Sequence, residues 1–151
     1  MRAIAAILAA LILGACVGGD EHPDRPPSTV TFGSSGAVLY VDIAETPADQ
    51  RRGLMGVEQL PGNEGMAFVY EEPVDHSFWM KDTLIPLSIA FVDGSGRVVG
   101  LREMEPCHAD PCPTYGIRTP YVLAVEANRG WFEEHRVGVG DRAELQVRAY
   151  L

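Results

Sequence analysis

Four side chains that could carry metal or redox chemistry lie close together in the chain. They are Cys107, His108, Asp110 and Cys112. Thiolate, imidazole and carboxylate groups all bind zinc or copper, although this spacing matches no established zinc finger or ribbon. The two cysteines could instead form a disulfide, or remain a free or redox-active pair. The residue types leave these three possibilities open.

The third cysteine, Cys16, follows an amino-terminal sequence typical of export. Arg2 and the apolar residues 3–13 have the layout of a secretory signal peptide, too short to cross a bilayer as a stable helix. The small residues before Cys16 resemble the lipobox of bacterial lipoproteins, in which the signal is removed and the cysteine is lipidated. The alternative is an ordinary signal peptide cut near Ala15, with Cys16 left as a thiol.

Lipidation of Cys16 would leave Cys107 and Cys112 as the remaining thiols in an oxidising compartment, where a disulfide is the simplest outcome. That bond would close a short loop and contribute roughly 2 kcal/mol on the chain-entropy model. The disulfide would therefore hold a local turn rather than the whole fold.

The chain divides into three parts. We expect a lipoprotein signal peptide over residues 1–15, a flexible tether over 16–28 and a single β domain over 29–151, because 16–28 is rich in glycine and proline and lacks apolar periodicity. The lipid anchor would place the protein in the cell envelope, on the periplasmic side or the cell surface of a bacterial membrane.

Composition argues against several functions. The net charge is −9, from 12 Lys+Arg and 21 Asp+Glu, and such a surface repels nucleic-acid phosphates. The sequence contains no Gly-x-Ser-x-Gly, phosphate-binding loop or dinucleotide fingerprint. We therefore expect no nucleic-acid partner and no cofactor, and no motif indicates catalysis.

Short stretches rich in β-branched and aromatic residues predict the secondary structure. The predicted strands cover 29–32, 37–44, 66–70, 76–80, 87–92, 97–101, 121–127 and 143–150. A helix should run from Thr46 to about Met55 and stop at Gly56, and Asn128 should cap a second helix through residues 130–135. Residues 105–120 form a long irregular section. These elements favour a mostly β fold, a small antiparallel barrel or jelly-roll-like sandwich with two short helices.

The stretch from Ser77 to Asp93 is predicted as the central strand of this domain. At least one of Phe78, Trp79 and Met80 should fill the core, although Trp79 could also stack on a flat ligand. Lys81 and Asp82 interrupt the apolar run. They either form an ion pair with each other that turns the chain, or contact a ligand.

Five short motifs resemble the domain of unknown function 192 family. They are Arg52-Gly53-Leu54-Met55; Gly65-Met66-Ala67-Phe68; Ser77 to Thr83 with Ile85-Pro86-Leu87; Pro106-Cys107 with Asp110-Pro111-Cys112; and Gly130-Trp131-Phe132 with Gly138-Val139-Gly140-Asp141. The resemblance covers about 38–145 and implies a compact, mostly β fold, often exported, with no assigned activity. The family's flanking arginines are replaced by Gln50 and Val57, and Arg51 and Arg52 are adjacent substitutes.

Two functions are consistent with the sequence. The first is a membrane-anchored, non-enzymatic module that binds a small molecule, a glycan or an envelope protein. Its candidate ligand-binding residues are Trp79, Lys81, Asp82, Arg52 and Tyr115. The alternative is an envelope metal-binding or thiol-redox enzyme centred on the loop from Cys107 to Cys112.

Overall fold

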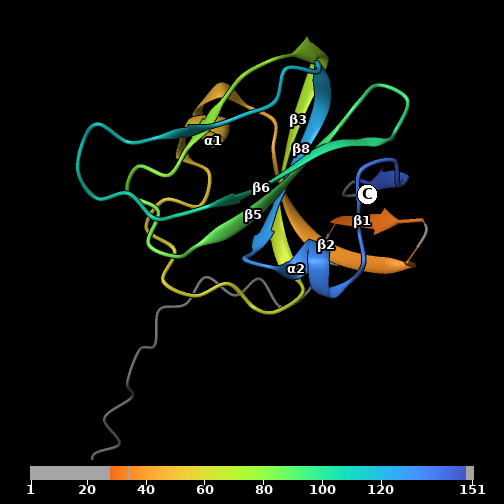
Figure 1. Cartoon of the computed structure of the whole chain (residues 1–151), viewed down its shortest axis with the longest axis horizontal. Coiled ribbons are helices and arrows are strands. Elements are labelled where there is room, and N and C mark those ends of the chain that lie inside the picture. Colours follow the sequence, from red (N-terminus) through yellow and green to blue (C-terminus); the bar gives the residue numbers. More distant parts are fainter. Residues whose placement is uncertain (1–27, 34, 149–151) are drawn as a thin grey trace, which may run out of the picture.

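A seven-stranded sheet organises the fold in the computed structural model, which describes residues 28–33 and 35–148. The strand order is β6-β5-β8-β3-β2-β1-β9, and the sheet curls into about half a barrel (Figure 1). The strands are β1 (Ser28–Phe32), β2 (Ala37–Ala44), β3 (Glu64–Val74), β5 (Leu87–Val92), β6 (Val98–Met104), β8 (Tyr121–Asn128) and β9 (Ala143–Gln146). The mostly β class predicted from the sequence is confirmed.

The remaining elements are short. Strands β4 (Phe78–Trp79) and β7 (Thr114–Tyr115) form a separate two-stranded sheet, and the helices are α1 (Pro47–Arg52) and α2 (Trp131–Glu134). Within the part of the chain that the structure describes, no helix is long and apolar enough to cross a membrane.

The pairing of β2 with β3 departs from an all-antiparallel fold. These two strands are parallel, with Val41 opposite Gly65 and Ala44 opposite Phe68. A parallel neighbour requires a crossover, which here contains α1 and the loop after it. The predicted hairpins β1–β2 and β5–β6 are antiparallel as expected.

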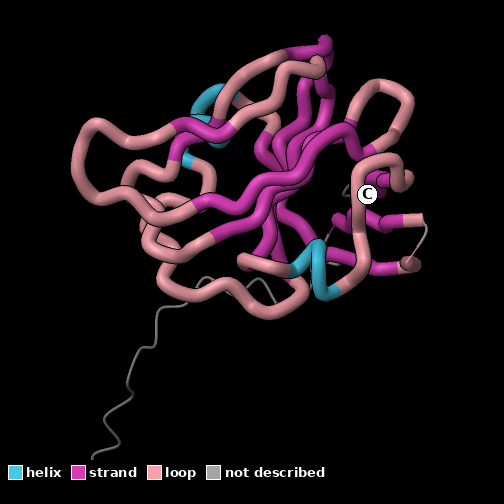
Figure 2. Tube along the Cα trace, viewed as in Figure 1, coloured by secondary structure: helices cyan, strands magenta, loops and turns pink. Residues whose placement is uncertain are grey.

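Two hydrophobic cores lie on opposite faces of the sheet. One face holds Phe32 together with Trp131 and Phe132, so α2 covers it. The other holds Phe68 and Phe91, and the long loops that Figure 2 draws in pink cover it through side chains such as Leu54, Met80 and Ile117. All six residues of β5 are buried, because this strand lies between the two cores.

Helix α1 ends three residues earlier than predicted. The Thr46 hydroxyl accepts a hydrogen bond from the Asp49 amide at 3.2 Å, so the predicted start is correct. Gly53, with φ 47°, ends the helix instead of Gly56. This positive-φ conformation, which glycine adopts readily, breaks the helix at the first glycine that the chain reaches.

Helix α2 is not capped by Asn128, as the sequence suggested. Its cap residue is Gly130, with φ 79° and no side-chain capping bond among the described residues. The Asn128 amide instead donates to the carbonyl oxygens of Leu60 at 2.8 Å and Pro61 at 3.1 Å. Asn128 therefore fastens a distant loop to the end of β8.

The stretch from Ser77 to Asp93 is not one central strand. Its first part, β4, pairs with β7 outside the main sheet, and only β5 joins that sheet. Between them Asp82 has φ 55°, a conformation that interrupts an extended chain. The middle strand of the main sheet is β3, flanked by β8 and β2.

Candidate functional site

A cavity of about 360 Å³ lies between α1 and β4, on the sheet face that carries Phe68. Three segments line it: α1 with the turn that follows, strand β3, and residues 76–79 with Thr83. Glu126 of β8, an interior strand of the sheet, joins the lining. Residues from the crossover, the central sheet and the loop after β3 therefore converge on one space.

Glu126 is the buried acid of this cavity. Its register places it between Met66 of β3 and Ile89 of β5, and only 5% of its surface is exposed. Within residues 28–33 and 35–148 its carboxyl group has no hydrogen-bond or ion-pair partner. Burial raises the pKa of Glu126 to about 8, because a low-dielectric environment disfavours the carboxylate.

The Glu126 carboxyl group reaches the cavity rather than the sealed core. Among the described residues, no side-chain polar atom is both shut off from solvent and without a hydrogen-bond partner. An unpartnered carboxyl group in this structure must therefore keep contact with solvent, which the cavity supplies. Buried polar groups are nearly always paired, so an unpaired one facing a cavity indicates a place for a ligand.

Thr83 supplies a second polar group of this kind. Thr83 is 4% exposed and lines the same cavity. Its backbone amide donates to the Met80 carbonyl at 3.1 Å, and in the described part of the chain its hydroxyl group has no protein partner. The hydroxyl can donate or accept one hydrogen bond to a bound molecule.

Aromatic rings form much of the remaining wall. Phe68 and Phe78 pack edge to face with centroids 5.0 Å apart. Tyr70 packs in the same way against His76 at 5.6 Å. Burial is the main reason that the pKa of Tyr70 is raised, and the nearby Glu126 adds to it. Trp79 is 51% exposed and so lies at the edge of the cavity.

Two arginines lie at the mouth of the cavity. Arg51 and Arg52 occupy the last turn of α1, line the cavity and are exposed. Among the described residues neither guanidinium has an ion-pair partner. The site thus has an unpaired acid at its floor and unpaired cations at its entrance.

The candidate residues from the sequence separate into two groups. Trp79 and Arg52 line the cavity, whereas Lys81, Asp82 and Tyr115 do not. Tyr115 lies opposite Phe78 in the β4–β7 pair, and its hydroxyl accepts a hydrogen bond from the Glu105 amide at 3.2 Å.

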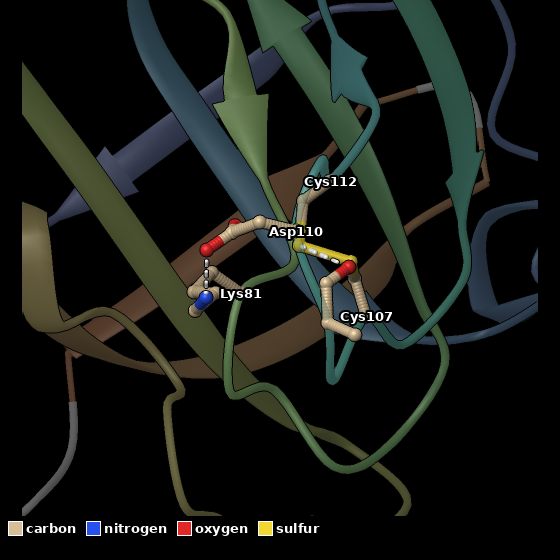
Figure 3. A network of polar contacts seen from close by, with 5 residues as sticks. Lys81, Cys107, Asp110 and Cys112 are labelled. Carbon is tan, nitrogen blue, oxygen red and sulfur yellow. Dashed lines mark hydrogen bonds and ion pairs between the residues drawn. A yellow bond between two sulfur atoms is a disulfide. The ribbon is translucent and has the colours of Figure 1, made fainter.

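Lys81 and Asp82 do not form the ion pair that the sequence suggested. The Lys81 ammonium group lies 2.5 Å from Oδ2 of Asp110 (Figure 3). Asp82 holds the turn through its backbone, because its amide donates to Cys107 at 3.1 Å and its carbonyl accepts from Gly56 at 3.0 Å. Lys81 therefore acts through its side chain, and Asp82 through its backbone.

The expected disulfide between Cys107 and Cys112 is present, with Cα atoms 5.8 Å apart (Figure 3). The bond occupies both sulfurs that the alternative metal site requires as thiolates. No group of three or more potential metal-ligating side chains occurs among residues 28–33 and 35–148. His108 and Asp110 are exposed, and Asp110 binds Lys81. Cys16, the expected lipidation site, lies outside the described residues.

Glu126 and Thr83 are the functional candidates that the sequence reasoning missed. Glu126 interrupts the otherwise apolar stretch from Tyr121 to Ala127. A charged residue inside a strand that is apolar at neighbouring positions is a usable signal, since both faces of such a strand are buried. Thr83 carried no comparable signal, because it follows two charged residues that predict an exposed turn.

These features define a small β domain with a ligand-sized cavity that holds a buried acid. A family model, "Uncharacterized ACR", matches residues 29–145, and the chain belongs to this family, DUF192. The resemblance inferred from the five motifs is thereby confirmed. No curated protein matches the chain.

Two crystal structures are similar to the chain. A protein of unknown function from Novosphingobium aromaticivorans DSM 12444 is 34% identical, with a TM-score of 0.70 over 78% of this chain and 83% of that one. A protein from Sinorhizobium meliloti 1021, described as a candidate transcription regulator, is 28% identical, with a TM-score of 0.71 over 80% of this chain and 94% of that one. The fold is therefore shared with solved relatives, and neither description assigns a ligand.

Proposed function

We propose that this protein is a lipid-anchored module of the cell envelope that binds a small molecule, without catalysis, in the cavity between α1 and β4. Glu126 is the observation that carries the proposal. Its carboxyl group is buried and lacks a protein partner in the described part of the chain. Keeping such a group costs free energy in the empty state, and a bound molecule that supplies its missing partner recovers part of that cost.

The cavity supports a small molecule better than a glycan or a protein partner. Its volume of about 360 Å³ is at the lower end of the range for small-molecule sites. Its wall combines aromatic rings with a few polar groups, which is the usual composition of such sites. The exposed Trp79 could close over part of the ligand.

The anchor rests on the amino-terminal sequence. Small residues precede Cys16, and the apolar residues 3–13 come before them. Lipidation at Cys16 would attach the domain to the membrane through the segment 16–28, and at least two acyl chains would be needed for stable attachment.

A nucleic-acid role has less support. The similar protein from Sinorhizobium meliloti is described as a candidate transcription regulator, but the present chain has a net charge of −9. DNA binding relies on cationic surface that neutralises phosphates, and the 21 Asp+Glu of this chain outnumber its 12 Lys+Arg.

Ligand-observed NMR with a fragment library tests the binding role. Fragments that bind the full protein should lose affinity at least fivefold in Trp79→Ala, because Trp79 lines the cavity. Lys81→Ala is the matched control, since Lys81 is a predicted ligand residue that does not line the cavity. Equal loss in both variants, or binding unaffected by Trp79→Ala, would remove this cavity as the site.

Metabolic labelling with a palmitate analogue tests the anchor. The wild-type protein should take up the label and sediment with membranes, whereas Cys16→Ser should do neither. Membrane association of unlabelled Cys16→Ser would show that the anchor is not a lipid on this residue.

A further inference from the structure

We infer that the cavity takes a small zwitterion, with its ammonium group on Glu126 and its carboxylate on Arg51 and Arg52. The inference rests on the proposed function, because it names the chemical class of the ligand of that same cavity. It follows from where the unpaired charges lie: the acid at the floor calls for a cation, and the arginines at the entrance call for an anion.

The floor requires a cation. Glu126 has 5% exposure, and in the described residues no lysine, arginine or histidine pairs with it. Its flanking partners in the sheet, Met66 and Ile89, are apolar. A buried carboxylate is tolerated when a cation is hydrogen-bonded to it, so an ammonium group from a ligand would complete the arrangement.

The walls favour the same group. Phe68, Tyr70, Phe78 and Trp79 surround the cavity between its floor and its edge. Aromatic faces attract organic cations through the ring quadrupole, and the attraction grows when water is excluded. An amine moving toward Glu126 would therefore pass favourable ring surface before it reaches the acid.

The entrance requires an anion. Arg51 and Arg52 are exposed neighbours at the end of α1, and neither is paired within the described residues. Arginine recognises carboxylates through two parallel hydrogen bonds. An amine without an acid would leave these guanidinium groups without an anion, so a zwitterion complements both ends better than either single ion.

Protonation links binding to pH. The charged and titratable groups that line the cavity with Glu126 are Arg51 and Arg52 from α1, Tyr70 from β3, and His76 before β4. Because the pKa of Glu126 is about 8, binding an ammonium ion at pH 7 releases the Glu126 proton to the buffer while the ligand keeps its own. Affinity should rise at least tenfold from pH 6 to pH 8, as the ionised fraction of Glu126 grows.

Three probes with the same ethylbenzene body separate the charges: 4-(2-aminoethyl)benzoate, phenethylamine and 4-ethylbenzoate. The first carries its ammonium and carboxylate at opposite ends, as the cavity requires. Calorimetric or NMR titration of the full protein at pH 8 should find aminoethylbenzoate the tightest. Glu126→Gln should weaken aminoethylbenzoate and phenethylamine at least tenfold while leaving ethylbenzoate unchanged or tighter. The double variant Arg51→Gln/Arg52→Gln should weaken aminoethylbenzoate and ethylbenzoate instead.

Glu103→Gln is the matched acid control, because Glu103 lies outside the cavity and next to Arg129. It should leave all three affinities unchanged, and circular dichroism should show every variant folded. Tighter binding of ethylbenzoate than of phenethylamine, or phenethylamine affinity that survives Glu126→Gln, would overturn the zwitterion. If other fragments bind in the cavity but none of the three probes binds the protein, the zwitterion is overturned while the proposed function stands. Absence of any cavity ligand would overturn both.

Discussion

The ammonium group of Lys81 lies 2.5 Å from Oδ2 of Asp110, a residue 29 positions further along the chain. Its sequence neighbour Asp82 is not its partner. The pair joins the turn after β4 to the disulfide loop, where Lys81 and Cys107 also form a parallel β-bridge. The backbone adds two bonds, from Asp82 to the Cys107 carbonyl and from Cys107 to the Met80 carbonyl.

The Lys81–Asp110 pair should contribute little stability. Their side chains are 26% and 68% exposed, and ion pairs at the surface typically contribute about 0.2–1 kcal/mol. Lys81→Met and Asp110→Asn should each lower the free energy of unfolding by less than about 1 kcal/mol, as measured by urea denaturation. A double-mutant cycle should return a coupling of the same size. A coupling above about 2 kcal/mol would show that the pair is a major support of the loop.

Loss of the disulfide should loosen the same region without unfolding the domain. Cys107→Ser/Cys112→Ser should cost roughly 2 kcal/mol, because the closed loop is short. Amide exchange should quicken at Asp82 and Cys107, whose backbone bonds join the two segments, and remain slow in β8. Uniformly faster exchange would contradict a local role.

Alkylation and metal analysis of the unreduced protein test the alternative redox or metal site. Cys107 and Cys112 should resist alkylation until a reductant is added, and the protein should carry no stoichiometric zinc or copper. Rapid alkylation without reductant, together with bound metal, would favour the alternative.

Glu126 should make the protein less stable as pH rises. Its pKa is about 8 in the folded protein and near 4.3 in an unfolded chain. Between these values the unfolded state has already lost its proton while the folded state retains it. The unfolded state therefore binds fewer protons, so stability falls with rising pH and levels off above about 8.

Glu126→Gln removes this dependence while preserving shape. Relative to wild type, the variant should gain at least about 2 kcal/mol of unfolding free energy between pH 4 and pH 8, given about 1.4 kcal/mol per pKa unit. Urea denaturation across this range measures the gain. If the plots of unfolding free energy against pH are parallel for the two proteins, Glu126 is ionised in the folded state without a loss of stability.

Gly65 should tolerate no side chain. A Cβ atom there would lie 2.1 Å from the Glu126 carbonyl oxygen and 2.8 Å from a methyl group of Leu39. Gly65→Ala should therefore destabilise the protein by more than about 2 kcal/mol, since the obstacle is backbone in the central sheet. Gly62→Ala is the control, because nothing lies within 4 Å of a Cβ at that position. Equal thermal midpoints for the two variants would contradict the close packing.

Features set by neighbouring residues could be predicted from the sequence. The hairpin of β1 and β2 follows from alternation, and Leu39 and Val41 point inward as expected. Thr46 begins α1 because its hydroxyl and the Asp49 amide are within one turn. Such interactions depend on spacing along the chain, so the local pattern is sufficient.

Features that depend on distant partners were predicted incorrectly or missed. Asn128 has the residue type of a helix cap. Its side-chain amide instead donates to the carbonyl oxygens of Leu60 and Pro61, which belong to a loop far away in the sequence. The stretch from Ser77 to Asp93 has enough apolar residues for one strand, yet β4 pairs with β7. Local propensity cannot choose between competing partners that the chain brings together only on folding.

The sequence by itself determined the fold class, the family and the main hairpins, and it favoured a disulfide between Cys107 and Cys112. These follow from alternation, turn residues, motif order and cysteine parity, all of which can be read along the chain. Only the tertiary structure decided that Lys81 binds Asp110, and that Glu126 shares one cavity with Trp79 and Arg52. The cavity is made by residues from separate segments, and its position depends on how the crossover and the loops pack over the curled sheet.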